Sequence, residues 1–167
     1  MQLELGGDLF AEQPEFSSEL FGILAAIVIL LIVFGSLLAM GLPIITALFG
    51  IVCGSFLIML LTRVLSVPDF TTQVAAMIGI GVGIDYALFV VTRHRGFLHD
   101  GHDPVEAAAR ANATAGTAVL FAGSTVVVAL MGLLLAGIPS IATMGYASAI
   151  AVAVAMLGAV TLLPAFL

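Results

Sequence analysis

Hydrophobic residues occur in five long runs, separated by shorter stretches that hold most of the polar residues. Each run is close to the roughly 20 residues that an α-helix needs to cross the hydrocarbon core of a bilayer. The first two runs meet at Gly41-Leu42-Pro43, because glycine permits a turn and proline suits the first position of the next helix. The pattern predicts helices at about residues 20–40, 43–62, 70–92, 114–135 and 140–166.

The distribution of charge predicts how these helices are oriented. The polar segment 93–113 contains three of the four arginines, whereas residues 1–19 contain five acidic residues and no basic one. Basic residues favour the cytoplasmic side of a membrane, so 93–113 is expected in the cytoplasm and the N-terminus outside it. Five spans then leave the C-terminus in the cytoplasm. Within the polar segment, Asp103 followed by Pro104 predicts the start of a short interfacial helix over about residues 104–112.

The composition supports a membrane protein. Hydrophobic residues make up 62% of the chain, charged residues 8%, and the mean hydropathy is +1.30. A soluble domain needs more polar surface than this. We therefore interpret residues 20–167 as an all-α bundle of five transmembrane helices in the plasma membrane, preceded by an acidic extracytoplasmic tail, residues 1–19. The net charge of −6 argues against a nucleic-acid partner.

One acidic residue, Asp85, lies inside the third run, about 12 Å along the helix axis from Arg93. An ionised aspartate near the bilayer centre costs roughly 2.5–3.5 kcal/mol on insertion scales, and such residues usually have a function. Small residues with four-residue spacing form a face nearly opposite Asp85, where another helix can approach closely. Both sides of this helix are therefore expected to face other helices rather than lipid. The small residues are Ala75, Gly79, Gly83 and Ala87.

The predicted spans contain no lysine, arginine or histidine that could pair with Asp85. The hydroxyl groups of Ser124 and Thr125 are predicted at a similar depth and could share a hydrogen bond with it. A carboxyl group that takes up and releases a proton inside the membrane is what a proton-driven transporter needs. Alternatively, a protonated Asp85 bonds a hydroxyl group and only locks helix packing. Tyr86 is either a packing aromatic residue or a hydrogen-bond donor to a carboxylate on another helix.

The glycines of the second and third spans are interpreted as helix-packing positions. They are Gly50, Gly54, Gly79, Gly81 and Gly83. A phosphate-binding loop is excluded for the last three, because no strand precedes them and they lie at membrane depth.

The polar segment offers little chemistry of its own. Arg93 and Arg95 are predicted to anchor the end of the third span in the cytoplasm and to contact lipid head groups, worth about 1 kcal/mol each. His99 and His102 are interpreted as part of a solvated turn rather than a metal site. No nucleophile and base converge in the sequence, so we expect no enzymatic activity, no cofactor and no metal.

Three sequence segments together resemble one family. GIGVGIDYALFVVTRHR, the downstream DPVEAAARANATAG and the final TLLPAFL resemble MmpL-type transporters of the RND superfamily, actinobacterial members above all. The resemblance covers essentially the whole chain. In that family two six-helix halves face each other, and their Asp-Tyr pairs relay protons that drive export of lipids or other hydrophobic molecules. The resemblance implies that the five spans are helices two to six of one half, a unit also found in sterol-sensing domains. It also implies that Asp85 is the proton-relay acid and Tyr86 its partner across the two halves.

Two departures from the family pattern lie in the fourth span. Family members often have Gly-Arg-Thr where this chain has Gly116-Thr117-Ala118, and a serine near the position of Ala122. Ser124 or Thr125 is the expected replacement for the missing hydroxyl group.

The resemblance thus implies the membrane part of a proton-driven exporter, acting with a second half or a second copy that carries a matching Asp-Tyr helix. Two alternatives stay open. One is a non-transporting lipid- or sterol-sensing-like module, in which a groove between spans binds a hydrophobic ligand. The other is an accessory or truncated subunit of a larger membrane complex. The sequence does not identify the substrate.

Overall fold

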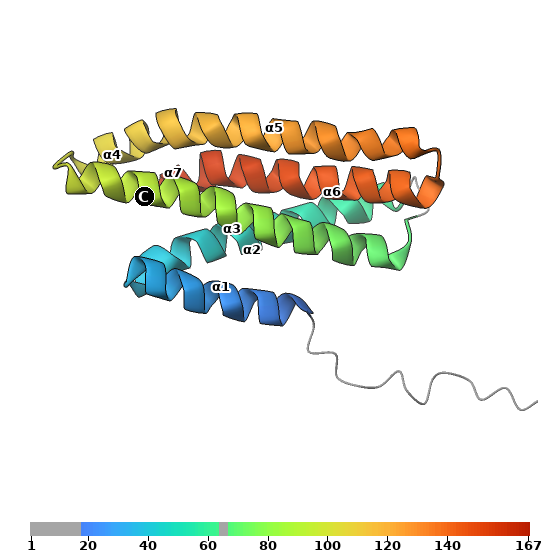
Figure 1. Ribbon diagram of the computed structural model, residues 1–167, viewed down its shortest axis with the longest axis horizontal. Helices are drawn as coiled ribbons and strands as arrows, with labels where there is room; N and C mark the ends of the chain where they lie inside the picture. The colour runs from blue at the N-terminus through green and yellow to red at the C-terminus, as the bar shows by residue number, and fades with distance from the viewer. Residues whose placement is uncertain (1–17, 64–66) are drawn as a thin grey trace, which may run out of the picture. The chain divides into compact units, whose positions relative to one another are not determined.

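The computed structural model describes residues 18–63 and 67–167, and this part of the chain is almost entirely helical, without β-strands (Figure 1). The chain divides into two units at Gly35, residues 1–35 and 36–167. The described part of the first unit is a single apolar helix, α1 (Ser18–Phe34). The predicted acidic tail, residues 1–19, lies almost wholly outside the described residues.

The second unit is a helical bundle. Its longer helices are α2 (Leu37–Leu61), α3 (Asp69–His99), α5 (Thr117–Met131) and α6 (Pro139–Leu157). Shorter elements continue or join them: α4 (Pro104–Ala111), the π-helical segments η2 (Asn112–Gly116) and η4 (Gly158–Leu162), the 3₁₀ segment η3 (Gly132–Ala136), and α7 (Leu163–Phe166).

Four helical stretches of the described residues are long and apolar enough to cross a membrane. They are Met40–Leu61, Phe70–His99, Pro104–Ala136 and Pro139–Phe166. These stretches match the second to fifth predicted spans and make the chain a multi-pass membrane protein. The described helix α1 has 17 residues, so the first span, and with it the total of five and the predicted orientation, stays a prediction.

The α6 helix packs against α2, α3 and α5 (Figure 1). Its buried residues are mostly small, which allows three neighbours to approach it closely. Gly54 lies where an added Cβ would be 3.7 Å from the Cα of Ala151, and Gly50 has the same relation to Ala155. The buried residues of α6 are Thr143, Gly145, Ala147, Ser148, Ala149, Ala151, Val152 and Ala155.

The glycines of α3 differ in their surroundings. A Cβ at Gly79 would be 3.2 Å from the Cβ of Ala151, and one at Gly83 would contact Ala47 of α2. Gly81 is exposed, and a Cβ there would meet nothing within 4 Å. Gly81 therefore makes no close helix contact within this bundle, because it points about 200° away from Gly79 around the helix, and its packing against another helix stays a prediction.

The boundary between the first two helices also differs from the prediction. The break lies at Gly35, whose φ of +61° suits glycine, and not at residues 41–43. Pro43 lies inside α2, at its seventh residue, and prolines are tolerated inside membrane-spanning helices. The Thr46 hydroxyl group donates to the carbonyls of Leu42 and Pro43 (3.0 and 2.9 Å) in the same turn.

The polar segment is more helical than predicted. α3 continues for two turns beyond residue 92, to His99, and presents a buried His94 between exposed arginines. As predicted, α4 begins after Asp103, whose carboxylate accepts a hydrogen bond from the Val105 N–H (3.3 Å). However, α4 does not end before the next span. It runs through η2 directly into α5, so that Pro104–Ala136 is one helical stretch.

Candidate functional site

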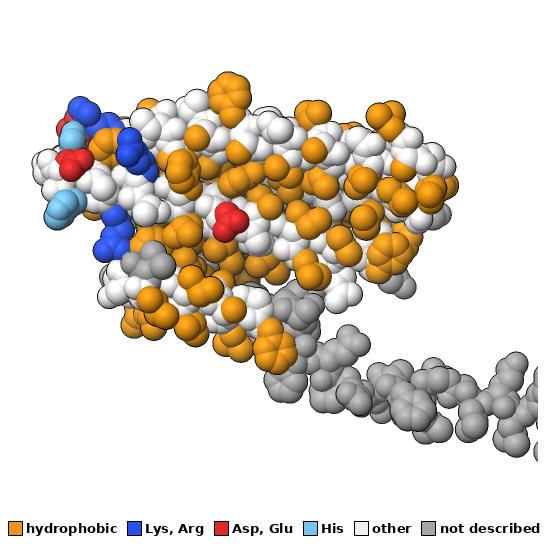
Figure 2. Space-filling model, viewed as in Figure 1, with side chains coloured by type: hydrophobic (Ala, Val, Ile, Leu, Met, Phe, Trp, Pro, Cys, Tyr) orange, Lys and Arg blue, Asp and Glu red, His pale blue; other side chains and the backbone are white. Residues whose placement is uncertain are grey.

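Asp85 lies on the outer side of α3. Its side chain is exposed and Tyr86 is half-buried, whereas Gly83 and Ala87 are buried against the bundle. The 100° spacing of helical residues accounts for this division, as the sequence predicted. Figure 2 shows an acidic side chain surrounded by hydrophobic ones, apart from the charged residues gathered at one end of the protein.

A shallow groove of about 350 Å³ opens at Asp85, between α3 and α5. Asp85 and Tyr86 supply its polar groups. Phe89, one turn further along α3, and three residues of α5 make the rest of its wall apolar. These three are Ala118, Val119 and Ala122.

The structure does not place the predicted hydroxyl groups in this groove. Ser124 donates to the Leu120 carbonyl (2.6 Å) and Thr125 to the Phe121 carbonyl (2.9 Å), so each bonds its own helix. Ser124 follows Ala122 by two residues, about 200° around α5, and therefore points away from the groove. Thr125 is about 60° from Ala122 and one turn further along the helix. The expectation that either hydroxyl group replaces a missing one beside Asp85 finds no support in this arrangement.

Sequence reasoning missed the three residues that do face Asp85. The signal was available in part, because Ala118 and Ala122 are among the positions where the sequence departs from the pattern of the family that it resembles. Both alanines lie in the α5 wall of the groove. This wall is consequently apolar along its length.

Asp85 also lacks a cation. In the part of the chain that the structure describes, no ion pair joins Asp85 to a basic side chain, whereas Arg110 pairs with Glu106 (2.7 Å). A carboxylate on an apolar face at membrane depth is costly unless it is protonated, hydrated or partnered by a group from outside the bundle. The groove can therefore accept a proton, and its open side can accept a side chain from another helix.

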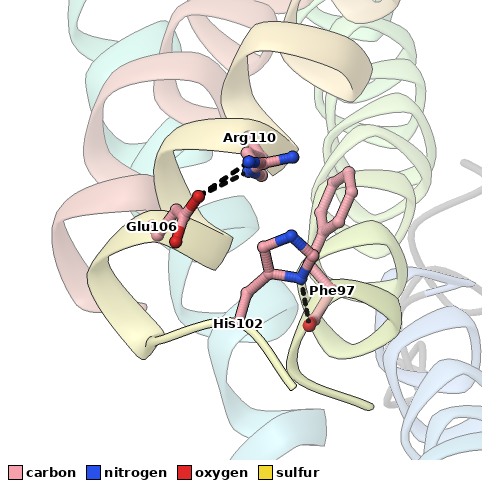
Figure 3. Close-up of polar contacts among 4 residues, drawn as sticks. All are labelled: Phe97, His102, Glu106 and Arg110. Atoms are coloured by element: carbon pink, nitrogen blue, oxygen red, sulfur yellow. Dashed lines mark hydrogen bonds and ion pairs between the residues drawn. The ribbon is translucent and has the colours of Figure 1, made fainter. Parts of the chain in front are cut away.

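A second group of polar residues lies at the C-terminal end of α3 and in the segment that follows it (Figure 3). The Arg93 guanidinium carbon is 5.0 Å from the centroid of the Phe97 ring, and Arg95 is exposed. The His102 Nδ1 lies 3.2 Å from the Phe97 carbonyl oxygen. In the described residues no three His, Cys, Asp or Glu side chains come together as a metal site would require.

A larger apolar groove of about 690 Å³ lies between α4 and α7. Its volume is in the range of about 300–1,000 Å³ that is usual for ligand pockets. Asn112 contributes its main polar side chain, and the Oδ1 atom of Asn112 is buried without a hydrogen-bond partner. The remaining lining residues are Pro104, Val105, Ala108, Ala109, Ala113, Pro164, Ala165 and Leu167.

Comparisons with known proteins point to one family. The sequence profile of the MMPL family matches residues 9–167. The membrane protein YdfJ of Bacillus subtilis is 47% identical over 169 residues, which cover 100% of this chain and 23% of YdfJ. SCO6666 of Streptomyces coelicolor is 42% identical over 94% of this chain and 22% of its own length.

A mycobacterial relative has a name that states a function. The mycolic acid-containing lipids exporter MmpL11 of Mycolicibacterium smegmatis is 39% identical over 84% of this chain and 15% of MmpL11. The resemblance is therefore not confined to actinobacterial proteins, since the Bacillus relative has the higher identity. The chain spans less than a quarter of the length of each of these three relatives.

Proposed function

The chain belongs to the MMPL family, and from that premise we propose that it is the transmembrane part of a proton-driven exporter of lipids or other hydrophobic molecules. That it is a multi-pass membrane protein of a transporter type follows from the family and from its apolar helices. We propose in addition that the proton gradient supplies the energy and that the exported molecule is hydrophobic. Asp85 and Tyr86 would couple proton movement to export.

The observation that carries the proposal is the exposure of Asp85 on the apolar outer face of α3. A carboxyl group that served only packing would be expected among the buried contacts of the bundle, bonded to a hydroxyl group. Asp85 instead faces a groove with an apolar opposite wall. In the proposed cycle Asp85 takes up a proton from one side of the membrane and releases it to the other. One elementary charge crossing the field is worth about 2.3 kcal/mol per 100 mV.

The proposed partner is a second transporter half, or a second copy of this chain, with a matching Asp-Tyr helix. Tyr86 stands beside Asp85 at the groove and would donate its phenolic hydrogen to the partner's carboxylate. Phe89 and the alanines of α5 would pack against the apolar side chains of that helix. Membrane lipids would cover the rest of the apolar surface. We expect no bond-breaking chemistry at this site, because the groove holds no nucleophile with a general base.

Proton flux tests this function directly. The chain, reconstituted in lipid vesicles together with any second half that co-purifies, is given a pH gradient, and a pH-sensitive dye inside the vesicles reports proton entry. Asp85→Asn keeps the size of the side chain but cannot carry a proton, so we expect flux to fall to the level of empty vesicles. Asp100→Asn, in the exposed turn after α3, is the matched control and should leave flux unchanged. Equal flux in the wild type and in Asp85→Asn would refute the proton relay.

The groove between α4 and α7 favours a second candidate function, binding of a hydrophobic ligand without transport. Its apolar walls and its volume of about 690 Å³ would accommodate an acyl chain. In that case Asp85→Asn would leave ligand binding intact, whereas Ala109→Trp would narrow the groove and weaken binding of a spin-labelled fatty acid. Loss of binding on Ala109→Trp, together with unchanged flux on Asp85→Asn, would favour this function over export.

A further inference from the structure

The two walls of the Asp85 groove both rest on α6. The groove residues belong to α3 and α5, and each of these helices packs along α6 (Figure 1). Direct contacts between α3 and α5 are far fewer than the contacts that either helix makes with α6. The distance between the two walls therefore depends mainly on how each helix is seated on α6.

The α3 wall has a fixed seat. A Cβ at Gly83 would lie 3.5 Å from the Cβ of Ala155 on α6 and 3.5 Å from the Cβ of Ala47 on α2. Gly83 precedes Asp85 by two residues, about 3 Å along the helix axis, so this seat lies at the level of the groove. The contacts are made by backbone and methyl groups, which have no rotamers to change. The α3 wall is therefore held in place by two neighbouring helices.

The α5 wall is seated differently, on the side chain of Met156. Gly123 directly follows Ala122 of the groove, and Met156 directly follows Ala155, so the two seats lie at the same level of α6. A Cβ at Gly123 would lie 2.5 Å from the Sδ of Met156, 2.8 Å from its Cγ and 3.1 Å from its Cβ. Carbon atoms in contact are normally about 3.5–4.0 Å apart. Met156 thus occupies the space that any side chain at position 123 would need.

We propose that Gly123 is a positioning residue: its missing side chain lets α5 settle onto Met156, and this contact sets the width of the Asp85 groove. A methionine side chain can turn its sulfur aside, but the Cβ of Met156 is fixed by the backbone of α6. A side chain at position 123 would therefore push α5 away from α6. The inference rests on the proposed function for its consequence, whereas the position of α5 can be measured independently of transport.

The far end of α5 limits how the helix can move. There a Cβ at Gly145 of α6 would lie 2.7 Å from the Leu130 carbonyl oxygen, so the two backbones are already in close contact. Pressure at Gly123 should consequently tilt α5 about this end. The tilt would move Ala122 away from Asp85 and widen the groove by about 1 Å, the distance by which the overlap with Met156 falls short of a normal contact.

Spin-label distances in the full chain in lipid nanodiscs test the inference. One label is attached at Phe49→Cys on α2, which is fixed to α3, and the other at Phe121→Cys on α5, in a chain carrying Cys53→Ala. Both phenylalanines are exposed. With Gly123→Ala we expect the mean distance between the labels, measured by double electron–electron resonance, to increase by about 1 Å. A second pair, with the α5 label at Met131→Cys near the close contact of Leu130, should change much less.

A second substitution supplies the rescue. Met156→Ala, added to Gly123→Ala, removes the Sδ and Cγ atoms that the new methyl group would overlap, so most of the increase should disappear. The matched control is Gly132→Ala at the end of α5, where an added Cβ meets nothing within 4 Å, and it should leave the distance between Phe49 and Phe121 unchanged. An unchanged distance in Gly123→Ala would overturn the proposal, as would an increase that persists in the double variant.

A suppression test links the groove width to docking. Ala122→Leu fills part of the groove and should weaken association with a second half under the proposed function. If Gly123 sets the width, adding Gly123→Ala should recover part of that association, whereas a purely structural role predicts a further loss. Sedimentation of the detergent-extracted particle measures association, and a further loss would overturn the link to docking. If the wild-type chain sediments as a monomer, the proposed partner fails, whereas the spin-label distances still decide whether Gly123 positions α5.

Discussion

Asp85 and Ala122 line the same groove from two different helices, so the side chain that α5 presents beside the acid is a methyl group. A methyl group neither donates a hydrogen bond to a carboxylate nor neutralises its charge. The small methyl group leaves space beside the carboxylate, however, and a side chain from a second Asp-Tyr helix would need that space. Under the proposed function, the groove is one half of an interface.

A larger side chain at Ala122 should block this interface. Ala122→Leu would fill part of the groove, and overfilling a packed contact costs about 1–3 kcal/mol, so we expect association with the second half and proton flux to fall about tenfold or more. Sedimentation of the detergent-extracted particle measures the first effect and the vesicle assay the second. Val128→Leu changes an exposed residue of α5 (71% exposed) outside the groove and should alter neither. Full activity of Ala122→Leu would show that nothing docks in the groove.

The particle extracted in mild detergent should contain more than one copy of the bundle. If the Asp85 face is covered by a second copy, its protein mass should be twice the 17.1 kDa of the chain, and if by a separate half, a second protein should co-purify. Multi-angle light scattering, with mass spectrometry of the components, gives both answers. A monomer, or a complex whose other members lack an Asp-Tyr helix, would contradict the proposed partner.

A closely packed glycine of α6 and an exposed glycine of α3 should respond oppositely to substitution by alanine. In Gly145→Ala the new Cβ would be 2.7 Å from the Leu130 carbonyl oxygen and 3.1 Å from the Leu133 Cβ, so we expect a loss of about 1–3 kcal/mol in the free energy of unfolding. In Gly81→Ala the Cβ meets open space, and the gain in helix propensity should stabilise the protein by up to about 1 kcal/mol. Unfolding by SDS titration in mixed micelles compares the two variants. Equal stabilities would mean that α5 and α6 are less closely packed than described.

The cap of α4 should be measurable on its own. Asp103→Ala removes the acceptor of the Val105 N–H, and losing such a cap costs about 0.5–2 kcal/mol. We expect faster hydrogen exchange in the first turn of α4 and little change in α6. Asp100→Ala, three residues earlier in the turn, is the control and lies outside the cap. Unchanged exchange after Asp103→Ala would show that Pro104 alone is enough to start the helix.

Much of the fold could be predicted from hydrophobic pattern alone, because a span requires a long apolar run and these runs are obvious. The helix start at Asp103 was also predictable, since a capping acid and a proline act locally. The sequence pattern places the break at residues 41–43 and not at Gly35, because a glycine followed by a proline is the stronger local signal. A proline inside a membrane-spanning helix is tolerated, however, and a glycine with positive φ ends a helix.

The candidate site could be predicted only in part. The outward face of Asp85 follows from helical periodicity within one segment. The residues of α5 opposite it do not, because depth in the membrane can be estimated from sequence, whereas the rotation of one helix about its axis relative to another cannot. Ser124 illustrates this, since it was expected at a similar depth to Asp85 and points away from the groove. The same limit applies to His102, whose contact with Phe97 depends on how the turn closes.

The contacts of α2 and α3 with α6 have a mechanical consequence. At Gly50, Gly54 and Gly79 the helices meet through backbone and methyl groups, without the long side chains that can change rotamer and absorb a displacement. Sliding one of these helices would open voids or create overlaps along its whole length. The helices α2, α3 and α6 should therefore move as one rigid body. A displacement of α3 at Asp85 would then move all three helices together instead of being absorbed by side chains that change rotamer.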